Sequence, residues 1–290
     1  MSQLKDLLER GKFVITAEVG PPKGADLREF KDIVRLLKGG VDALNVTDGQ
    51  GASMKLSSLA GCVAILQEGA EPVMQMTGRD RNRIAIQSEL LGAYALGVRN
   101  LLAITGDYPT LGDNPSAKPV YDLDSVGILL AASSLMEGRD LAGNPLKGEP
   151  PSFYLGATVN PNFEPLEIEL IKMEKKIHAG ARFFQTQAVY QIDIADRFMK
   201  EASRLNVKIL IGIIPLRSVR SAHFVSKMIP GVKVPQGLIH RLESAPDPKL
   251  EGLRIAAELI RKVREHGLAH GIHIMAIGAE RSIPLLLDML

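Results

Sequence analysis

The amino-acid sequence predicts an α/β fold, a single (β/α)8 TIM barrel over residues 1–290, and two observations carry this prediction. Short apolar or β-branched runs recur eight times, and amphipathic stretches with helical periodicity lie between them. Strict alternation of strand and helix produces a parallel sheet, and eight strands are the number that closes such a sheet into a barrel. The expected strands span residues 13–19, 42–47, 72–77, 100–105, 153–159, 182–187, 207–214 and 271–276.

The helices of this barrel are predicted from the same periodicity. Gly39, Gly97 and Gly180 stand where three helices should end, and Ser53 and Asp80 stand where two should begin with an N-cap. The expected helices span an N-terminal segment of about residues 2–11 and then residues 27–38, 53–67, 80–96, 122–136, 165–179, 190–204 and 248–267.

A doubly wound open sheet is the competing fold. Its dinucleotide-binding form carries G-x-G-x-x-G after the first strand, whereas the first strand here is followed by GPPKG at residues 20–24. Segments 109–121 and 138–151 are rich in Pro, Gly and Asn, and we interpret each as a long loop of the barrel rather than as a domain linker. The closed barrel is therefore the preferred prediction.

Composition excludes several classes of function. The chain has 35 Lys and Arg against 33 Asp and Glu, with no basic run and no Trp, which argues against nucleic-acid binding. Cys62 is the only cysteine, so the chain forms neither an internal disulfide nor a cysteine-held zinc or iron–sulfur centre. No apolar stretch is long enough to span a membrane, and the N-terminal residues lack an apolar leader. We expect a cytoplasmic protein.

Polar side chains gather at the C-terminal ends of six strands. Because strand side chains alternate with period two, the apolar residues of the first strand suit the helix-facing side and Glu18 points into the barrel. An interior built only for stability is packed with Val, Ile and Leu, so this polar set predicts a polar ligand in the barrel mouth. The expected inward residues are Glu18, Asn45, Thr47, Gln75, Thr77, Thr105, Thr158, Asn160, Gln185 and Gln187, with Asp107 just past the fourth strand.

The residues at these strand ends resemble the methylenetetrahydrofolate reductase family. Six motifs follow in the family's order and spacing from about residue 12 to residue 282, and together they are far more specific than any one alone. Ala17-Glu18-Val19-Gly20-Pro21-Pro22 resembles Phe-Glu-Phe-Phe-Pro-Pro, Asn45-Val46-Thr47-Asp48-Gly49 resembles Val-Thr-x-Gly, and Thr105-Gly106-Asp107-Tyr108-Pro109 resembles Arg-Gly-Asp-x-Pro. The other three motifs lie in the second half of the chain. Ala179-Gly180-Ala181 followed by Thr186-Gln187 resembles Ala-Gly-Ala-x-x-x-x-Thr-Gln, Gly212-Ile213-Ile214-Pro215 resembles Gly-Ile-x-Pro, and His273 stands where the family has His-Phe-Tyr-Thr-Leu-Asn.

The resemblance implies reduction of 5,10-methylenetetrahydrofolate to 5-methyltetrahydrofolate with a flavin as hydride donor. Glu18 is then the general acid that protonates N10 when the cyclic aminal opens, because a carboxyl in a partly desolvated mouth holds a raised pKa. Asp107 stabilises the resulting iminium cation, and Gln187 hydrogen-bonds the pterin. The cofactor implied is FAD, with FMN as the alternative, and the electron donor is NAD(P)H or an electron-delivering partner subunit; the chain is otherwise expected to form a homo-oligomer.

The same resemblance assigns a set of flavin-binding positions and one further folate contact, Arg281. Each position also has a plainer interpretation: the lysines of one helix face usually meet solvent, and Gly106-Asp107 followed by Pro is ordinary turn chemistry. His273 is interpreted as a hydrogen-bonded barrel histidine rather than a proton donor. The implied flavin-binding residues are Thr47, Gln75, Thr77, Thr105, Gly106, Asp107, Tyr121, Asn160, Glu169, Lys172, Lys175 and Lys176.

Several positions depart from the better-known bacterial form of the family. Thr105 replaces the arginine of Arg-Gly-Asp, Gln75 replaces a flavin-contacting histidine, and Val219 stands where an aromatic packs the nicotinamide. The eighth strand continues as Met275-Ala276-Ile277-Gly278 rather than Tyr-Thr-Leu-Asn. These changes leave the electron donor open and bring the chain closer to branches of anaerobic one-carbon metabolism.

Three other functions remain as alternatives. A folate- or pterin-binding barrel methyltransferase would use no flavin, and a non-catalytic barrel subunit of a one-carbon enzyme complex would need neither Glu18 nor Asp107. A phosphosugar aldolase would need a Schiff-base lysine on an inner strand face, and the only strand lysine, Lys208, stands near the wrong end of its strand.

Overall fold

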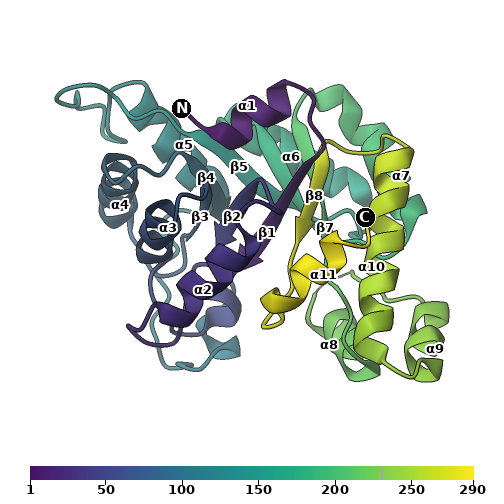
Figure 1. Ribbon diagram of the computed structural model, residues 1–290. Helices are drawn as coiled ribbons and strands as arrows, with labels where there is room; N and C mark the ends of the chain where they lie inside the picture. Colours follow the sequence, from purple (N-terminus) through teal and green to yellow (C-terminus); the bar gives the residue numbers. More distant parts are fainter. Residues whose placement is uncertain (230) are drawn as a thin grey trace.

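Eight parallel strands close into a barrel in sequence order, as predicted, with β8 paired to β1 (Figure 1). The structure is a computed structural model that describes residues 1–229 and 231–290. The strands are β1 (Val14–Val19), β2 (Ala43–Val46), β3 (Pro72–Thr77), β4 (Asn100–Ile104), β5 (Tyr154–Val159), β6 (Phe183–Ala188), β7 (Lys208–Ile213) and β8 (Gly271–Ile274).

Helices surround the barrel, and their ends depart from the sequence prediction at two N-caps. The α3 helix begins after Ser57, not Ser53, and α4 begins after Asn82, whose side chain accepts from two backbone N–H groups, not after Asp80. The main helices are α1 (Gln3–Glu9), α2 (Arg28–Leu37), α3 (Ser58–Gln67), α4 (Arg83–Ala95), α5 (Ser125–Met136), α6 (Leu166–His178), α7 (Ile192–Ala202) and α10 (Pro248–Glu265).

Three further helices lie in segments where the sequence predicted none: α8 (Val219–Met228), α9 (Gln236–Ser244) and α11 (Ile283–Leu287). The prediction placed a single helix, over residues 248–267, between the seventh and eighth strands and none after the eighth. The α8 helix begins with a capping box in which Ser218 and Ser221 exchange hydrogen bonds. Short 3-10 turns span Gln50–Ala52, Pro109–Leu111, Ser203–Leu205 and Glu280–Ser282.

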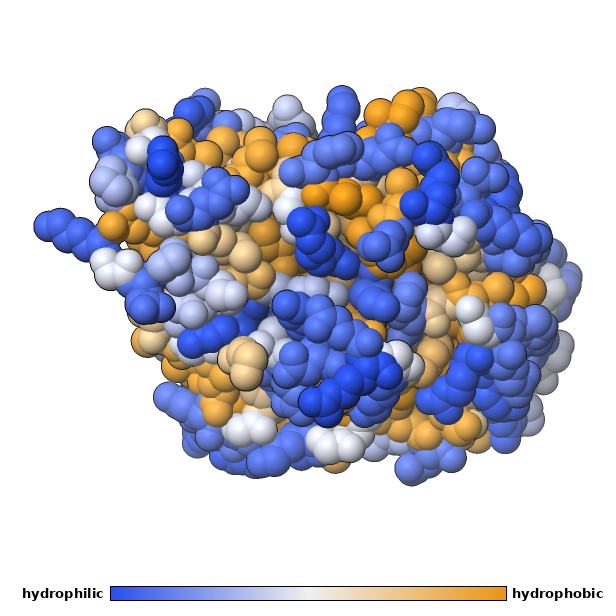
Figure 2. Space-filling view, turned by 90° about the horizontal axis from the view of Figure 1, so that it is seen from above, coloured by the Kyte–Doolittle hydropathy of each residue, from blue (hydrophilic) through white to orange (hydrophobic). Residues whose placement is uncertain are grey.

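The N-terminal half of the barrel interior is apolar. Tyr154 stacks on Phe183 with ring centroids 4.9 Å apart, and α1 adds Leu4 and Leu8 to the same cluster. The α1 helix lies across the end of the barrel at the top of Figure 1. Figure 2 looks onto that end, where hydrophilic side chains separate smaller hydrophobic groups. The other inner residues are Val14, Ala43, Val73, Leu102 and Leu210.

A hydrogen-bond network fastens α1 over this end. The Ser2 hydroxyl donates to Asn100 Oδ1 at 2.5 Å, and Asn100 Nδ2 donates to Glu71 Oε1 at 2.7 Å. The backbone N–H of Gln3 donates to the same Glu71 oxygen at 3.0 Å. With this end closed, the C-terminal ends of the strands form the mouth.

The inward and outward faces match the period-two prediction except on β4. Ala17 and Met74 pack in the outer cluster beneath the helices, as expected. On β4, however, Leu102 lies in the inner cluster and Ala103 in the outer one, so the inward placement of Thr105 is wrong. Thr105 is exposed, and its hydroxyl lies 3.4 Å from the Ser125 hydroxyl at the start of α5.

Gly156→Ala should destabilise the barrel, because a Cβ at this position would collide with the Phe183 ring. Overpacking of this kind costs about 1–3 kcal/mol, and urea unfolding followed by circular dichroism measures it. Gly92→Ala in α4 is the control, since its Cβ would meet nothing within 4 Å; it should leave stability unchanged or raise it by up to about 1 kcal/mol. Equal unfolding midpoints for the two variants would contradict this packing.

Candidate active site

Glu18 stands at the C-terminal end of β1 with its carboxyl inside the mouth, as the sequence predicted. The residue is only 7% exposed. Gln75 Nε2 of β3 donates to one carboxyl oxygen at 3.2 Å, and Gln50 Nε2 of the β2–α3 loop donates to the other at 2.9 Å. Burial raises the pKa of Glu18, and the nearby Glu280 carboxylate adds to that rise, while the two amides and Lys55 oppose it.

A belt of buried polar groups crosses the barrel beneath Glu18. His273 Nε2 lies 4.0 Å from Glu18, and His273 Nδ1 lies 2.9 Å from the Thr16 hydroxyl. Gln185 Nε2 donates to Thr16 at 3.3 Å, and Gln185 and Asn45 exchange hydrogen bonds of 2.7 and 3.1 Å. Burial lowers the pKa of His273 to about 3, so this imidazole is neutral at physiological pH and supplies no proton.

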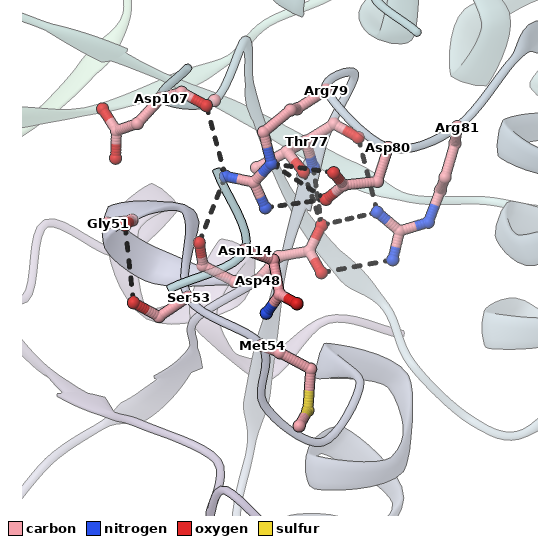
Figure 3. Close-up of polar contacts among 12 residues, drawn as sticks. Asp48, Gly51, Ser53, Met54, Thr77, Arg79, Asp80, Arg81, Asp107 and Asn114 are labelled. Atoms are coloured by element: carbon pink, nitrogen blue, oxygen red, sulfur yellow. Dashed lines mark hydrogen bonds and ion pairs between the residues drawn. The ribbon is translucent and has the colours of Figure 1, made fainter. Parts of the chain in front are cut away.

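An ion network at the ends of β2 and β3 was not foreseen from the sequence. Asp48 Oδ2 accepts from the backbone N–H and the hydroxyl of Thr77, both at 2.9 Å, and from Arg81 Nη1 at 2.7 Å (Figure 3). Arg81 also pairs with Glu89 at 2.6 Å. The Thr77 hydroxyl proton is therefore committed to Asp48, and its lone pairs remain as acceptors.

The β4–α5 loop brings Gly106 and Asp107 to the rim of the mouth. Gly106 has φ +96°, a conformation that favours glycine, and its carbonyl accepts from the Tyr121 hydroxyl at 3.1 Å. Asp107 is exposed, and Figure 3 shows its carboxyl group pointing away from the neighbouring Arg79 guanidinium. A carboxylate held in this way is open to a cation in the mouth.

The predicted residues of β5 and α6 form a connected group. Glu169 accepts from the backbone N–H of Asn160 at 3.0 Å and pairs with Lys172 at 2.9 Å. Lys176 Nζ donates to the Thr158 carbonyl at 2.7 Å, and burial lowers its pKa. Lys175 is exposed. The three lysines therefore do not form one cationic cluster. Lys172 is paired with the Glu169 carboxylate, Lys176 is hydrogen-bonded to β5, and Lys175 is exposed to solvent.

Thr47 carries the clearest sign of a ligand-binding position. Its hydroxyl is buried and has no hydrogen-bond partner, a condition that among the described residues it shares only with the Ser58 hydroxyl. A Cβ built on Gly20 would lie 3.8 Å from Thr47 Oγ1 and 3.4 Å from Lys55 Nζ, so both polar atoms lie close to Gly20. A buried hydroxyl without a partner is unfavourable, and a polar ligand in the mouth would supply one.

Gln187 and Arg281, the remaining predicted residues, lie near the end of β6 and after β8, respectively. Gln187 is half-buried within a register shift of β6 between Gln185 and Ala188, and Arg281 is exposed in the Glu280–Ser282 turn. A hollow of about 420 Å³ lies between α9 and α10, and another of about 260 Å³ lies at the N-terminal end of the barrel, so neither is at the mouth. Buried polar chemistry, rather than hollow size, therefore identifies the mouth as the candidate site.

Within residues 1–229 and 231–290, no three His, Cys, Asp or Glu side chains are placed to hold a metal ion. No helix in that part of the chain is long and apolar enough to cross a membrane.

Glu18→Gln should stabilise the protein at neutral pH. A raised pKa means that wild-type stability falls as pH rises from about the ordinary value of 4.5 through the higher folded-state pKa. The glutamine of the variant does not ionise, so its stability has no such dependence on pH. Its free energy of unfolding should therefore exceed that of wild type at pH 7 and approach it near pH 4. Urea unfolding across this range measures the difference, and a variant that is less stable at pH 7 but not at pH 4 would contradict the assigned shift.

Comparison with known proteins places this geometry in a family. A sequence profile described as methylenetetrahydrofolate reductase matches residues 3–290. The chain is 26% identical to methylenetetrahydrofolate reductase (NADH) 1 of Arabidopsis thaliana, over 97% of this chain and 49% of the plant protein. It is 23% identical to the 5,10-methylenetetrahydrofolate reductase of Pectobacterium carotovorum, over 89% of this chain and 84% of that protein. The chain thus spans about half the length of the plant relative and most of the bacterial one.

The fold recurs in a solved structure. An uncharacterized protein from Clostridium thermocellum that binds two copies of 5-methyl-5,6,7,8-tetrahydrofolic acid matches 99% of this chain and 97% of its own, with a TM-score of 0.65 and 17% identity. Since the profile matches nearly every residue of the barrel, this chain belongs to the methylenetetrahydrofolate reductase family.

Proposed function

We propose that this chain catalyses the flavin-dependent reduction of 5,10-methylenetetrahydrofolate to 5-methyltetrahydrofolate. The observation that carries the proposal is the Glu18 carboxyl, buried with a raised pKa at the mouth of a barrel of this family. The curated relatives carry this activity in their names, and the Clostridium protein's methyltetrahydrofolate supports a folate as the ligand of such a barrel.

Glu18 would act as the general acid. Opening the cyclic aminal of the substrate creates a cationic iminium at N5 and leaves N10 in need of a proton. A carboxyl with a raised pKa stays protonated closer to neutral pH and can deliver that proton. Gln50 and Gln75 would hold the carboxyl in place, and they also stabilise the carboxylate that remains after transfer.

A flavin fits the polar groups around the mouth. The unpartnered Thr47 hydroxyl and the inward Gln75 amide are suited to a heterocycle rich in carbonyl oxygens and ring nitrogens. A bound, reduced flavin would supply the hydride. FAD is proposed, with FMN as the alternative. The residues proposed to hold it are Thr47, Gln75, Thr77, Thr105, Gly106, Asp107, Tyr121, Asn160, Glu169, Lys172, Lys175 and Lys176.

Three residues are proposed to bind the folate. Asp107 would place its exposed carboxylate near the iminium cation and lower its energy, while Gln187 would hydrogen-bond the pterin and Arg281 would meet a more distant part of the substrate. The electron donor proposed is NAD(P)H, because relatives are named for NADH and for NADPH. An electron-delivering partner subunit is the alternative, and stopped-flow reduction of the bound flavin by each nucleotide distinguishes the two.

Glu18→Gln should abolish folate reduction while leaving flavin bound. Loss of a general acid lowers turnover by about 10²–10⁴-fold, whereas the amide keeps the shape and the hydrogen-bonding capacity of the side chain. The measurement is reoxidation of the reduced flavin by methylenetetrahydrofolate, with visible absorbance reporting flavin content. Glu201→Gln on the exposed face of α7 is the control and should behave as wild type. Normal turnover by Glu18→Gln would show that another group protonates N10.

Asp107→Asn should weaken folate reduction more than flavin retention. The substitution removes the negative charge that lowers the energy of the iminium cation and preserves the size of the side chain. Steady-state turnover and the dissociation constant of the flavin, measured on one preparation, compare the two effects. Equal loss of both would point to a role in folding the β4–α5 loop.

A further inference from the structure

The Arg79 side chain joins two loops at the mouth, and none of the roles proposed above uses it. It follows β3 and is only 5% exposed. Arg79 Nη1 donates to the Gly49 carbonyl of the β2–α3 loop at 3.2 Å and to the Asp107 carbonyl of the β4–α5 loop at 3.5 Å (Figure 3). A buried arginine normally serves a specific polar structure, because burying its charge is costly.

The charge of this arginine is balanced locally. Asp80, the next residue in the chain, accepts from Arg79 Nε at 2.8 Å and from Nη2 at 2.7 Å. This two-point ion pair fixes the plane of the guanidinium group and leaves Nη1 to meet the two carbonyls. Arg79 therefore holds main-chain atoms without adding a net positive charge to the mouth.

Arg79 holds the β4–α5 loop at both of its ends. The Asp107 carbonyl lies near the start of the loop, and the backbone N–H of Val120, near its end, donates to the Arg79 carbonyl at 2.7 Å. The two residues that flank these points are also joined, because the Tyr121 hydroxyl donates to the Gly106 carbonyl at 3.1 Å. Two successive carbonyls of the rim turn, those of Gly106 and Asp107, are thus each held by a different side chain.

The surrounding backbone leaves room for this arginine. A Cβ on Gly49 would collide with Arg79 Nη2, and a Cβ on Gly106 would lie 3.1 Å from Arg79 Cβ. Both glycines have positive φ, so a side chain there would also be strained. The arginine fills the space between two glycine turns that come from different strands.

From these contacts we infer that Arg79 is a positioning residue for Asp107, an inference that rests on the proposed function. It binds the main chain of Asp107 and not its carboxyl group, which points away from the guanidinium in Figure 3. Arg79 therefore fixes where the carboxylate stands without forming the ion pair that would neutralise it. A displacement of about 1 Å in a catalytic group lowers turnover by up to about 10²-fold.

The test is Arg79→Lys in the full-length, flavin-loaded protein. Lysine keeps the aliphatic stem beneath Gly106 and loses the planar fork that spans Asp80 and the two carbonyls. We expect kcat for methylenetetrahydrofolate to fall about 10- to 100-fold, with far smaller changes in KM and in flavin retention. Arg241→Lys is the matched control, because Arg241 also forms two-point ion pairs, with Glu251 and Glu258, but on α9. It should lose stability and keep wild-type kcat.

Hydrogen exchange provides the second measurement. Amides of residues 107, 108, 110 and 111 should exchange faster in Arg79→Lys than in wild type and stay unchanged in Arg241→Lys, whereas the Val120 amide, which donates to the main-chain carbonyl of Arg79, should be unchanged in both variants. Unchanged kcat overturns the inference, whatever the exchange rates, and so does a loss of kcat that only follows a loss of flavin. If wild type itself does not reduce the folate, the proposed function fails. Exchange then decides separately whether Arg79 positions the turn, and unaltered exchange would refute that.

Discussion

The site depends on one constraint: a carboxyl group is held inside a barrel whose N-terminal half is apolar. The apolar cluster around Phe183 and Tyr154, closed by α1, removes water beneath the mouth. Glu18 is buried on the mouth side of the polar belt that covers this cluster, so its ionisation costs desolvation energy and its pKa rises. The same burial lowers the pKa of His273 and keeps it neutral. The two neighbouring groups are therefore both uncharged over a range of pH in which free glutamate and histidine would attract each other.

The polar groups of the mouth fall into two sets: those that already have hydrogen-bond partners within the protein, and those that remain available to a ligand. Gln185 and Asn45 satisfy each other, and Asp48 is satisfied by Thr77 and Arg81. These hydrogen-bonded networks hold the interior and one side of the mouth rigid. The Thr47 hydroxyl is left without a partner, and the carboxylate of Asp107 faces away from the nearest arginine. The open groups stand at strand ends and loops, where barrel enzymes carry their chemistry.

Much of this could be predicted from the sequence, because period-two alternation is a strong signal wherever one strand face is clearly apolar. That signal placed Glu18, Gln75 and Gln185 inside the barrel. It failed on β4, where Leu102 and Ala103 are both apolar and nothing local marks the inner face. The contacts between Arg79 and the two loops could not be predicted from the sequence for a different reason. They join the ends of β2, β3 and β4 through main-chain carbonyls, which have no signature in the side-chain pattern.

The central claim is that burial keeps the Glu18 carboxyl protonated above the range of ordinary glutamates. The most direct measurement is the titration of that one carboxyl by NMR of protein labelled with ¹³C at the glutamate side-chain carboxyl, with Glu18→Gln used to assign its signal. The account predicts a midpoint clearly above 4.5 for this signal. A midpoint at or below 4.5 would mean that the carboxyl is ionised whenever the protein works, and the acid role would have to be given up.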